Sequence, residues 1–260
     1  MKFIKYFTII ATTSLVSLLT ACSTTQDPAT AYKNQTAEQI FQEGEKELRS
    51  NNYQDAIKHY EALDVQYPFG PHEEMLQLHS IYAYYMAGDY ASAEAAADRF
   101  IHAHPTSRHT DYAYYMRGLS NYYQNLGIFE KVFAIDLATR DLGQIKKSYK
   151  DFSELVYLFP NSYYAPAAHQ YMMYLRNLLA NHELEVAQYY FGRKAYVAAA
   201  NRATLVVRHY EGSPAVPEAL VVMAQSYRAM HLKTNEDEVL KVLQYNYPDS
   251  VYWQKAMRKD

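Results

Sequence analysis

Residues 53–68 read YQDAIKHYEALDVQYP, and residues 90–105 read YASAEAAADRFIHAHP. Each segment begins with tyrosine, has alanine three residues later, and ends in an aromatic residue or histidine followed by proline. A fixed spacing of this kind indicates an internal repeat. The small residues let two helices approach closely, and the proline ends the second helix of each pair.

Three further segments follow the same outline with substitutions. One has Ser148 in place of the alanine and closes at Pro160, another ends in Glu211 instead of proline, and the last closes at Pro248. The spacing is that of tetratricopeptide repeats, in which Gly44 would take the small position of the first helix. We therefore expect an all-α superhelix over residues 36–260, with about five repeats closing near residues 68, 105, 160, 211 and 248. Two spacings exceed the usual period, which places extra residues at 121–144 and 176–191.

The N-terminus has the order of a bacterial lipoprotein signal. Lys2 and Lys5 precede an apolar run that is too short for a spanning helix, and Leu-Thr-Ala-Cys ends at Cys22. We expect residues 1–21 to be removed and Cys22 to carry N-palmitoyl and S-diacylglycerol groups, with residues 22–35 as a flexible tether. Ser23, in place of aspartate, favours outer-membrane anchoring with the soluble part facing the periplasm. The alternative is an ordinary secretory signal with a chance cysteine.

Composition narrows the possible chemistry. Cys22 is the only cysteine, so its acylation would exclude disulfides, thiolate catalysis and cysteine-ligated zinc. Removal of Lys2 and Lys5 with the signal changes the formal net charge from −3 to −5, which argues against a nucleic-acid partner. The chain has 28 tyrosines, whose apolar rings and polar rims suit helix packing and peptide-binding grooves.

Catalytic motifs are missing from the sequence. It contains no phosphate loop, dinucleotide fingerprint or nucleophile elbow. His102, His104 and His109 lie close together, but their spacing matches no metal-ligand pattern. We therefore expect neither an enzyme nor a metal or cofactor site, apart from the covalent lipid.

Several strings along the chain are not demanded by any generic repeat, for example Phe69-Gly70 after the first closing proline and Met116-Arg117-Gly118. Through them the chain resembles the BamD family, lipoproteins of the outer-membrane β-barrel assembly (BAM) machine. The strings are Tyr67 to Pro71, Ile81 to Tyr85, Asp98 to Phe100, Asp111 with Tyr112, Tyr115 to Leu119, Asp151 to Ser153, Phe159 to Ser162, Val186 to Tyr190, Ala195 to Ala198, and Asn201 with Arg202.

The resemblance implies a non-catalytic scaffold for the assembly and insertion of outer-membrane proteins. Its implied partners are a POTRA-containing barrel subunit (BamA-like), accessory lipoproteins (BamC-like and BamE-like) and the C-terminal signals of unfolded barrel proteins. The family's POTRA contact falls on Arg193 and Arg202, although Lys194 replaces the glycine that follows the first arginine in the family. Without the resemblance, each arginine would be interpreted as a solvent-facing residue of a repeat helix.

The resemblance also suggests a substrate groove in the N-terminal repeats. Tyr82, Tyr85, Tyr114 and Tyr115 are the candidates, and they could equally belong to the core between helices. Two alternative functions have different partners. One is a periplasmic repeat lipoprotein that serves peptidoglycan enzymes or DNA uptake. The other is a solenoid enzyme such as a lytic transglycosylase, for whose separate catalytic lobe no residues are left.

Overall fold

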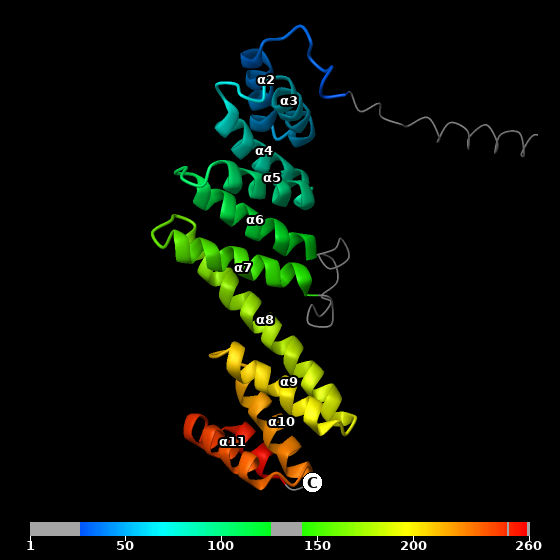
Figure 1. Ribbon diagram of the computed structural model, residues 1–260, viewed down its shortest axis with the longest axis vertical. Helices are drawn as coiled ribbons and strands as arrows, with labels where there is room; N and C mark the ends of the chain where they lie inside the picture. The colour runs from blue at the N-terminus through cyan, green and yellow to red at the C-terminus, as the bar shows by residue number, and fades with distance from the viewer. Residues whose placement is uncertain (1–26, 126–141, 249, 259–260) are drawn as a thin grey trace, which may run out of the picture. The chain divides into compact units, whose positions relative to one another are not determined.

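The computed structural model describes residues 27–125, 142–248 and 250–258 (Figure 1). Within these ranges the chain is helical and contains no strand, so the all-α prediction is confirmed. The chain divides into two compact units, unit 1 up to Glu73 and unit 2 from Glu74 onward. The helices are α2 Ala37–Arg49, α3 Tyr53–Gln66, α4 Glu73–Ala87, α5 Tyr90–Ala103, α6 Thr110–Asn125, α7 Gly143–Leu158, α8 Ala165–Gly192, α9 Tyr196–His209, α10 Val216–Ala229, α11 Lys233–Asn246 and α12 Val251–Met257.

Unit 1 contains the first helix pair, α2 and α3. Thr36 and Gln39 form a reciprocal capping box at the start of α2, which supplies partners for two backbone N–H groups. Gly44 takes its small position where α2 meets α3: a Cβ on Gly44 would lie 2.7 Å from Cε1 of Tyr60. Tyr60 is fully buried, and its hydroxyl donates to Glu45 at 2.7 Å. Glycine is therefore required where the two helices cross.

The structure describes the last nine residues of the expected tether, which was predicted over residues 22–35. Residues 27–35, here called the strap, form turns that pack against α3. The side-chain amide of Gln66 donates to the carbonyl oxygens of Pro28 and Ala31 at 2.7 and 2.5 Å, and Ala31 is buried. These hydrogen bonds provide partners for strap carbonyls that a flexible tether would leave to water.

The turn inside each described helix pair has one recurring conformation. A residue with positive φ follows the first helix, and the N–H of the next residue donates to a carbonyl five positions earlier, as Asn52 does to Glu47 at 2.9 Å. This is the Schellman motif, in which glycine is favoured at the left-handed position. That position is occupied by Asn51, Gly88, Lys194 and His231. Only one of the four turns therefore has the residue that suits it best.

The turns that close the repeats are equally regular. The residue that caps each second helix donates its N–H to the carbonyl four positions earlier, and the predicted closing position comes next. These caps are Tyr67, His104, Phe159, Tyr210 and Tyr247. Glu211 occupies a proline position in the fourth turn, which has the same cap hydrogen bond. The turn therefore does not require proline, and the five repeats keep their register.

Unit 2 contains two hydrophobic clusters that share one helix. α8 is 28 residues long, so the extra residues predicted at 176–191 lengthen this helix. Leu175 and Leu179 belong to the first cluster, whereas Ala180 and Leu184 belong to the second. Most of the other predicted insertion lies outside the described residues. None of the described helices combines the length and the apolar composition needed to cross a bilayer.

Candidate functional site

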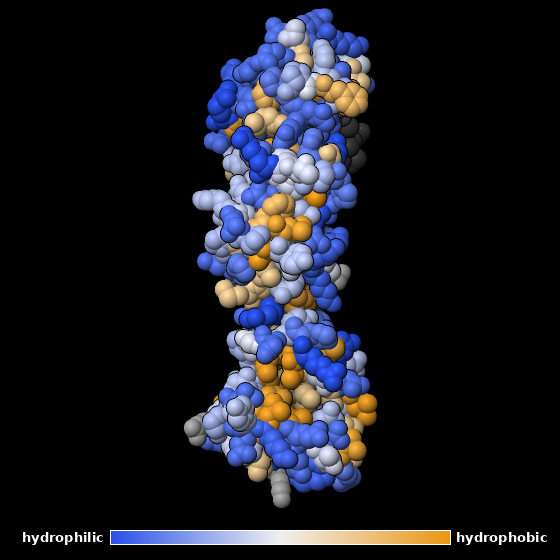
Figure 2. Space-filling model, turned by 60° about the vertical axis from the view of Figure 1, so that its left-hand side comes forward, coloured by the Kyte–Doolittle hydropathy of each residue, from blue (hydrophilic) through white to orange (hydrophobic). Residues whose placement is uncertain are grey.

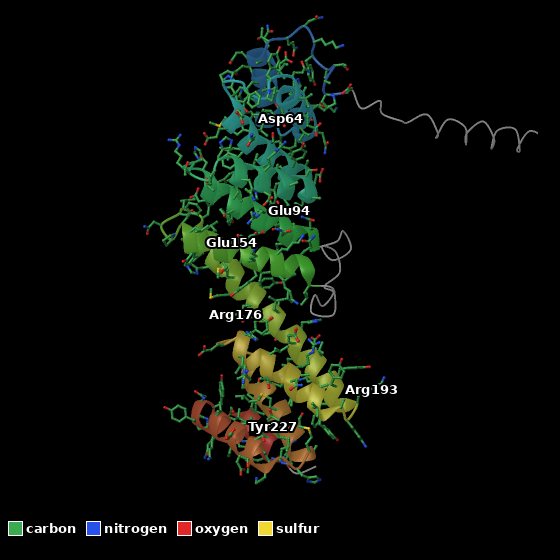
Figure 3. All side chains as sticks on the ribbon, viewed as in Figure 1. Asp64, Glu94, Glu154, Arg176, Arg193 and Tyr227 are labelled. Carbon is green, nitrogen blue, oxygen red and sulfur yellow. The ribbon has the colours of Figure 1, made fainter. Side chains whose placement is uncertain are left out.

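Arg193 lies at the turn between α8 and α9, where Figure 3 shows its side chain projecting from the end of α8. Its guanidinium lies 5.5 Å from the ring centroid of Tyr189, and its Nε donates to the hydroxyl of that tyrosine at 3.4 Å. Lys194 follows with φ of +61°, the conformation that favours glycine. The replacement of the family's glycine therefore keeps the turn, and the turn presents Arg193 at the surface.

Arg202 lies on α9 and has a partner within the chain. One of its terminal nitrogens donates to Oε2 of the buried Glu183 on α8, at 2.9 Å. The arginine side chain is 42% exposed, so part of its guanidinium faces solvent. The ion pair restricts the rotamers of the Arg202 side chain. A side chain that is already restricted loses less conformational entropy when it binds a carboxylate of a partner.

Arg193 and Arg202 interact with different residues of α8, and the residues next to them in the sequence border one surface depression. Its volume is about 500 Å³, and Tyr196, Val197 and Met230 line it with apolar surface. Lys194 and Asn201 border it beside the two arginines. An open apolar depression with a lysine on its border and two arginines next to lining residues in the sequence suits a protein partner with an apolar anchor and acidic residues around it. We call this region the C-terminal depression.

Two of the four candidate groove tyrosines are packed on more than one side. Tyr85 meets the rings of Tyr90 and Tyr123 at 5.5 and 5.9 Å. Tyr115 stacks on Tyr164 at 5.0 Å and contacts Phe152 at 5.9 Å. Burial raises the pKa of both phenols. Stacking of a peptide ring on either residue would require these neighbours to move.

The other two candidates differ in exposure. Tyr82 is 38% exposed. Tyr114 is partly buried, and the guanidinium of Arg117 lies 5.0 Å from its ring centroid. Figure 2 shows apolar side chains gathered in patches on one face of unit 2. Of the four tyrosines, Tyr82 is therefore exposed, whereas Tyr85, Tyr114 and Tyr115 are partly buried and packed against neighbouring aromatic rings.

Sequence reasoning missed the aromatic residues that α8 adds to this cluster. Tyr171 stacks on Phe152 at 4.9 Å and meets Tyr122 edge to face at 5.5 Å. Tyr174 lies 6.1 Å from Tyr122 and is exposed. A signal was present in the sequence, because tyrosines three residues apart share a helix face.

A charged network links three helices of unit 2. Arg117 on α6 contacts Asp98 on α5 at 2.6 Å, and Asp151 and Glu154 on α7 at 2.8 and 3.0 Å. Asn121 donates to Asp151 at 2.7 Å. Burial raises the pKa of Asp151 to about 6, although Arg117 and Asn121 act in the opposite direction. Asp98, Arg117 and Asp151 come from three of the sequence strings that carry the family resemblance, and in the structure they form one charged network.

The structure says less about the other residues considered in the sequence, the lipidation cysteine and the clustered histidines. Cys22 lies outside the described residues. Within the described ranges, no group of three His, Cys, Asp or Glu side chains is arranged to hold a metal ion. His102 instead donates from Nδ1 to the backbone carbonyl of Asp98, one turn earlier on its own helix, at 2.8 Å.

The helix pairs, their recurring turns and the surface depression define a tetratricopeptide-type protein whose candidate site suits protein binding. Residues 33–243 match the family described as YfiO, outer membrane lipoprotein. The chain belongs to this family, and its curated relatives are named outer membrane protein assembly factor BamD.

Three relatives illustrate the similarity. The Neisseria meningitidis serogroup B protein is 35% identical over 97% of this chain and 96% of its own length. The Pasteurella multocida protein is 35% identical over 95% and 92% of the two chains, and the Vibrio cholerae protein 34% over 93% and 99%. The solved structure of PilW, a type IV pilus biogenesis factor, is 14% identical and covers 86% of this chain and 99% of its own, with a TM-score of 0.35.

Proposed function

We propose that this chain is a non-catalytic outer membrane protein assembly factor, anchored to the outer membrane by lipid at Cys22 and facing the periplasm. The observation that carries the proposal is the similarity to relatives with that name over nearly the whole length of both chains. The family match to an outer membrane lipoprotein supports the location. In this role the chain joins a POTRA-containing barrel subunit, BamC-like and BamE-like lipoproteins and unfolded barrel substrates.

The C-terminal depression is the proposed POTRA contact. Tyr196, Val197 and Met230 offer the apolar surface. Arg193 and Arg202 each follow or precede a residue that lines the depression, and their guanidinium groups offer donors for acidic residues of the partner. Val197 in particular is exposed although it is apolar. Interface energy is usually concentrated in such anchors and in neighbouring arginines, so a few substitutions should weaken the complex.

The ion pair with Glu183 determines which substitution tests this contact. A glutamate at position 202 would face the buried Glu183, and the repulsion would disturb the crossing of α8 and α9. The double variant Glu183→Gln/Arg202→Gln removes both charges and keeps two side chains able to hydrogen-bond. Arg208→Gln, an exposed arginine on the same helix, is the matched control.

Each variant would be affinity-purified from detergent-solubilised envelopes, and the co-purifying proteins identified and quantified. In the triple variant Arg193→Ala/Glu183→Gln/Arg202→Gln, we expect the recovery of the POTRA-containing barrel subunit to fall about 30-fold. This corresponds to a loss of about 2 kcal/mol of binding free energy. The Arg208→Gln control should retain the barrel subunit. Equal recovery from all variants would refute the docking site. Recovery of cell-wall enzymes without a barrel subunit would refute the assembly function.

The substrate site is proposed on the accessible tyrosines of unit 2. Tyr82 and Tyr174 are exposed and could contact the aromatic end of a barrel signal, whereas the packed Tyr85 and Tyr115 would support the surface from below. A fluorescent peptide that copies a barrel protein's C-terminus should bind more weakly to Tyr82→Ala than to the wild type. Unchanged affinity for the peptide in the Tyr82→Ala, Tyr114→Ala and Tyr174→Ala variants would refute this part of the proposal.

A further inference from the structure

The loop that follows α3 exposes an aromatic ring on a well-defined turn. Phe69 is 92% exposed, although it is among the most apolar residues of the chain. The N–H of Gly70 donates to the carbonyl of Tyr67 at 3.0 Å, and the N–H of Glu73 donates to that of Gly70 at 3.2 Å. These hydrogen bonds hold the loop in shape, so it presents the ring to the surroundings.

The other closing turns can be compared with this loop, because they have the same hydrogen bond. In each, the N–H of the residue three positions after the cap donates to the carbonyl of the cap residue. At the sequence position of Phe69 these turns have Thr106, Asn161, Gly212 and Asp249. The turn therefore does not require an aromatic residue at this position. A fully exposed phenyl ring that the fold does not use indicates a contact with something outside the described chain.

The strap places this loop beside the anchor end of the chain. Tyr67, which begins the loop, donates its hydroxyl to the carbonyl of Gln35 at 3.3 Å, and the adjacent Gln66 donates to two strap carbonyls. Only four residues separate Cys22 from Asp27. Those five steps span at most about 18 Å when fully extended, so acyl chains on Cys22 would keep the start of the strap close to the bilayer surface.

We propose that Phe69, together with exposed Val65 on the last turn of α3, inserts into the interfacial layer of the bilayer to which Cys22 is anchored. Aromatic rings are favoured at this depth of a membrane. The two inserting side chains are uncharged, and the neighbouring Asp64, Glu73 and Glu74 are acidic, so the contact does not depend on attraction to anionic lipid. The inference rests on the lipid attachment proposed above, and it adds a second contact that orients unit 1 on the membrane.

The test uses the single tryptophan of the chain. Trp253→Phe removes it, and Phe69→Trp then creates one reporter at the loop. The matched control is Tyr163→Trp in the same background, because Tyr163 is 89% exposed and also follows a closing proline. The lipidated proteins are purified from envelopes and reconstituted into phosphatidylethanolamine and phosphatidylglycerol vesicles, with and without brominated acyl chains. Circular dichroism checks that each variant is folded.

We expect the emission of the reporter at 69 to shift to shorter wavelength and to be quenched by brominated lipid, in low and high salt alike, while the reporter at 163 is not quenched. If the protein floats with vesicles but the reporter at 69 stays unquenched, the contact is refuted and the anchor stands. If the protein does not float, both the anchor and the contact are refuted. If only a barrel-signal peptide shields the reporter at 69, the loop binds protein and the lipid contact is refuted.

Discussion

Replacement of Gly118 with alanine is expected to destabilise unit 2, because the new methyl group has no space. A Cβ at this position would lie 2.7 to 2.9 Å from three ring atoms of Phe152. That ring is fully buried and stacks on Tyr171 at 4.9 Å, while Tyr115 packs against it at 5.9 Å. It therefore cannot move away without disturbing both tyrosines.

The magnitude follows from two opposing terms. Alanine is favoured over glycine in a helix interior by about 1 kcal/mol. Overpacking of a core costs about 1 to 3 kcal/mol, and a contact this short with a ring confined by its neighbours belongs at the upper end. We expect a net loss of about 2 kcal/mol. For a chain of this size, that loss lowers the midpoint of thermal unfolding by about 4 to 8 °C.

Circular dichroism during thermal unfolding of the detergent-purified protein measures the shift. Gly192→Ala is the control, because a Cβ at this helical glycine meets nothing within 4 Å. The control should be neutral or slightly stabilising. In Gly118→Ala/Phe152→Leu the smaller side chain makes room, so the double variant should lose less than the two single variants together. A Gly118→Ala protein as stable as the wild type would refute the close-packing argument.

Three further predictions concern the turns, the charged network and the C-terminus. Lys194→Gly should raise the free energy of unfolding by about 0.5 to 1 kcal/mol, as measured by urea titration, because φ there is positive. Burial raises the pKa of Asp151 to about 6, so the folded state binds this proton more tightly than the unfolded chain does. The resulting stabilisation is complete below about pH 4 and is lost as the pH rises through about 6, and Asp151→Asn should abolish that slope in urea titrations. Arg228 donates to the carbonyls of Ala256 and Arg258, so Arg228→Gln should speed hydrogen exchange in α12 roughly tenfold.

The repeats could be predicted from the sequence because their determinants are local. The distance from Tyr53 to Pro68 recurs along the chain, and the small residue Gly44 lies at a fixed distance from the aromatic residue that it meets. Helix ends are also local, since the cap and its hydrogen-bond partner are only a few residues apart. Pattern and spacing were therefore sufficient for the fold class.

The remaining features depend on contacts between residues far apart in the sequence. Gln66 reaches Pro28 across 38 positions, so the pattern of residues 27–35 alone suggested a flexible tether. Arg202 was recognised as a candidate, but its partner Glu183 depends on how α8 and α9 cross. The same reason explains why Tyr85 and Tyr115 could not be assigned to groove or core from their spacing.

The length of α8 has a consequence for how unit 2 opens. A helix of 28 residues extends about 42 Å, and its two halves complete different hydrophobic clusters. If one cluster unfolds while the other stays folded, apolar residues on one half of α8 become exposed to water. That exposure costs free energy, so partial unfolding at the boundary between the clusters is unfavourable. We therefore expect the two clusters to unfold as one cooperative element, so that local opening of unit 2 begins at its C-terminus and connecting turns.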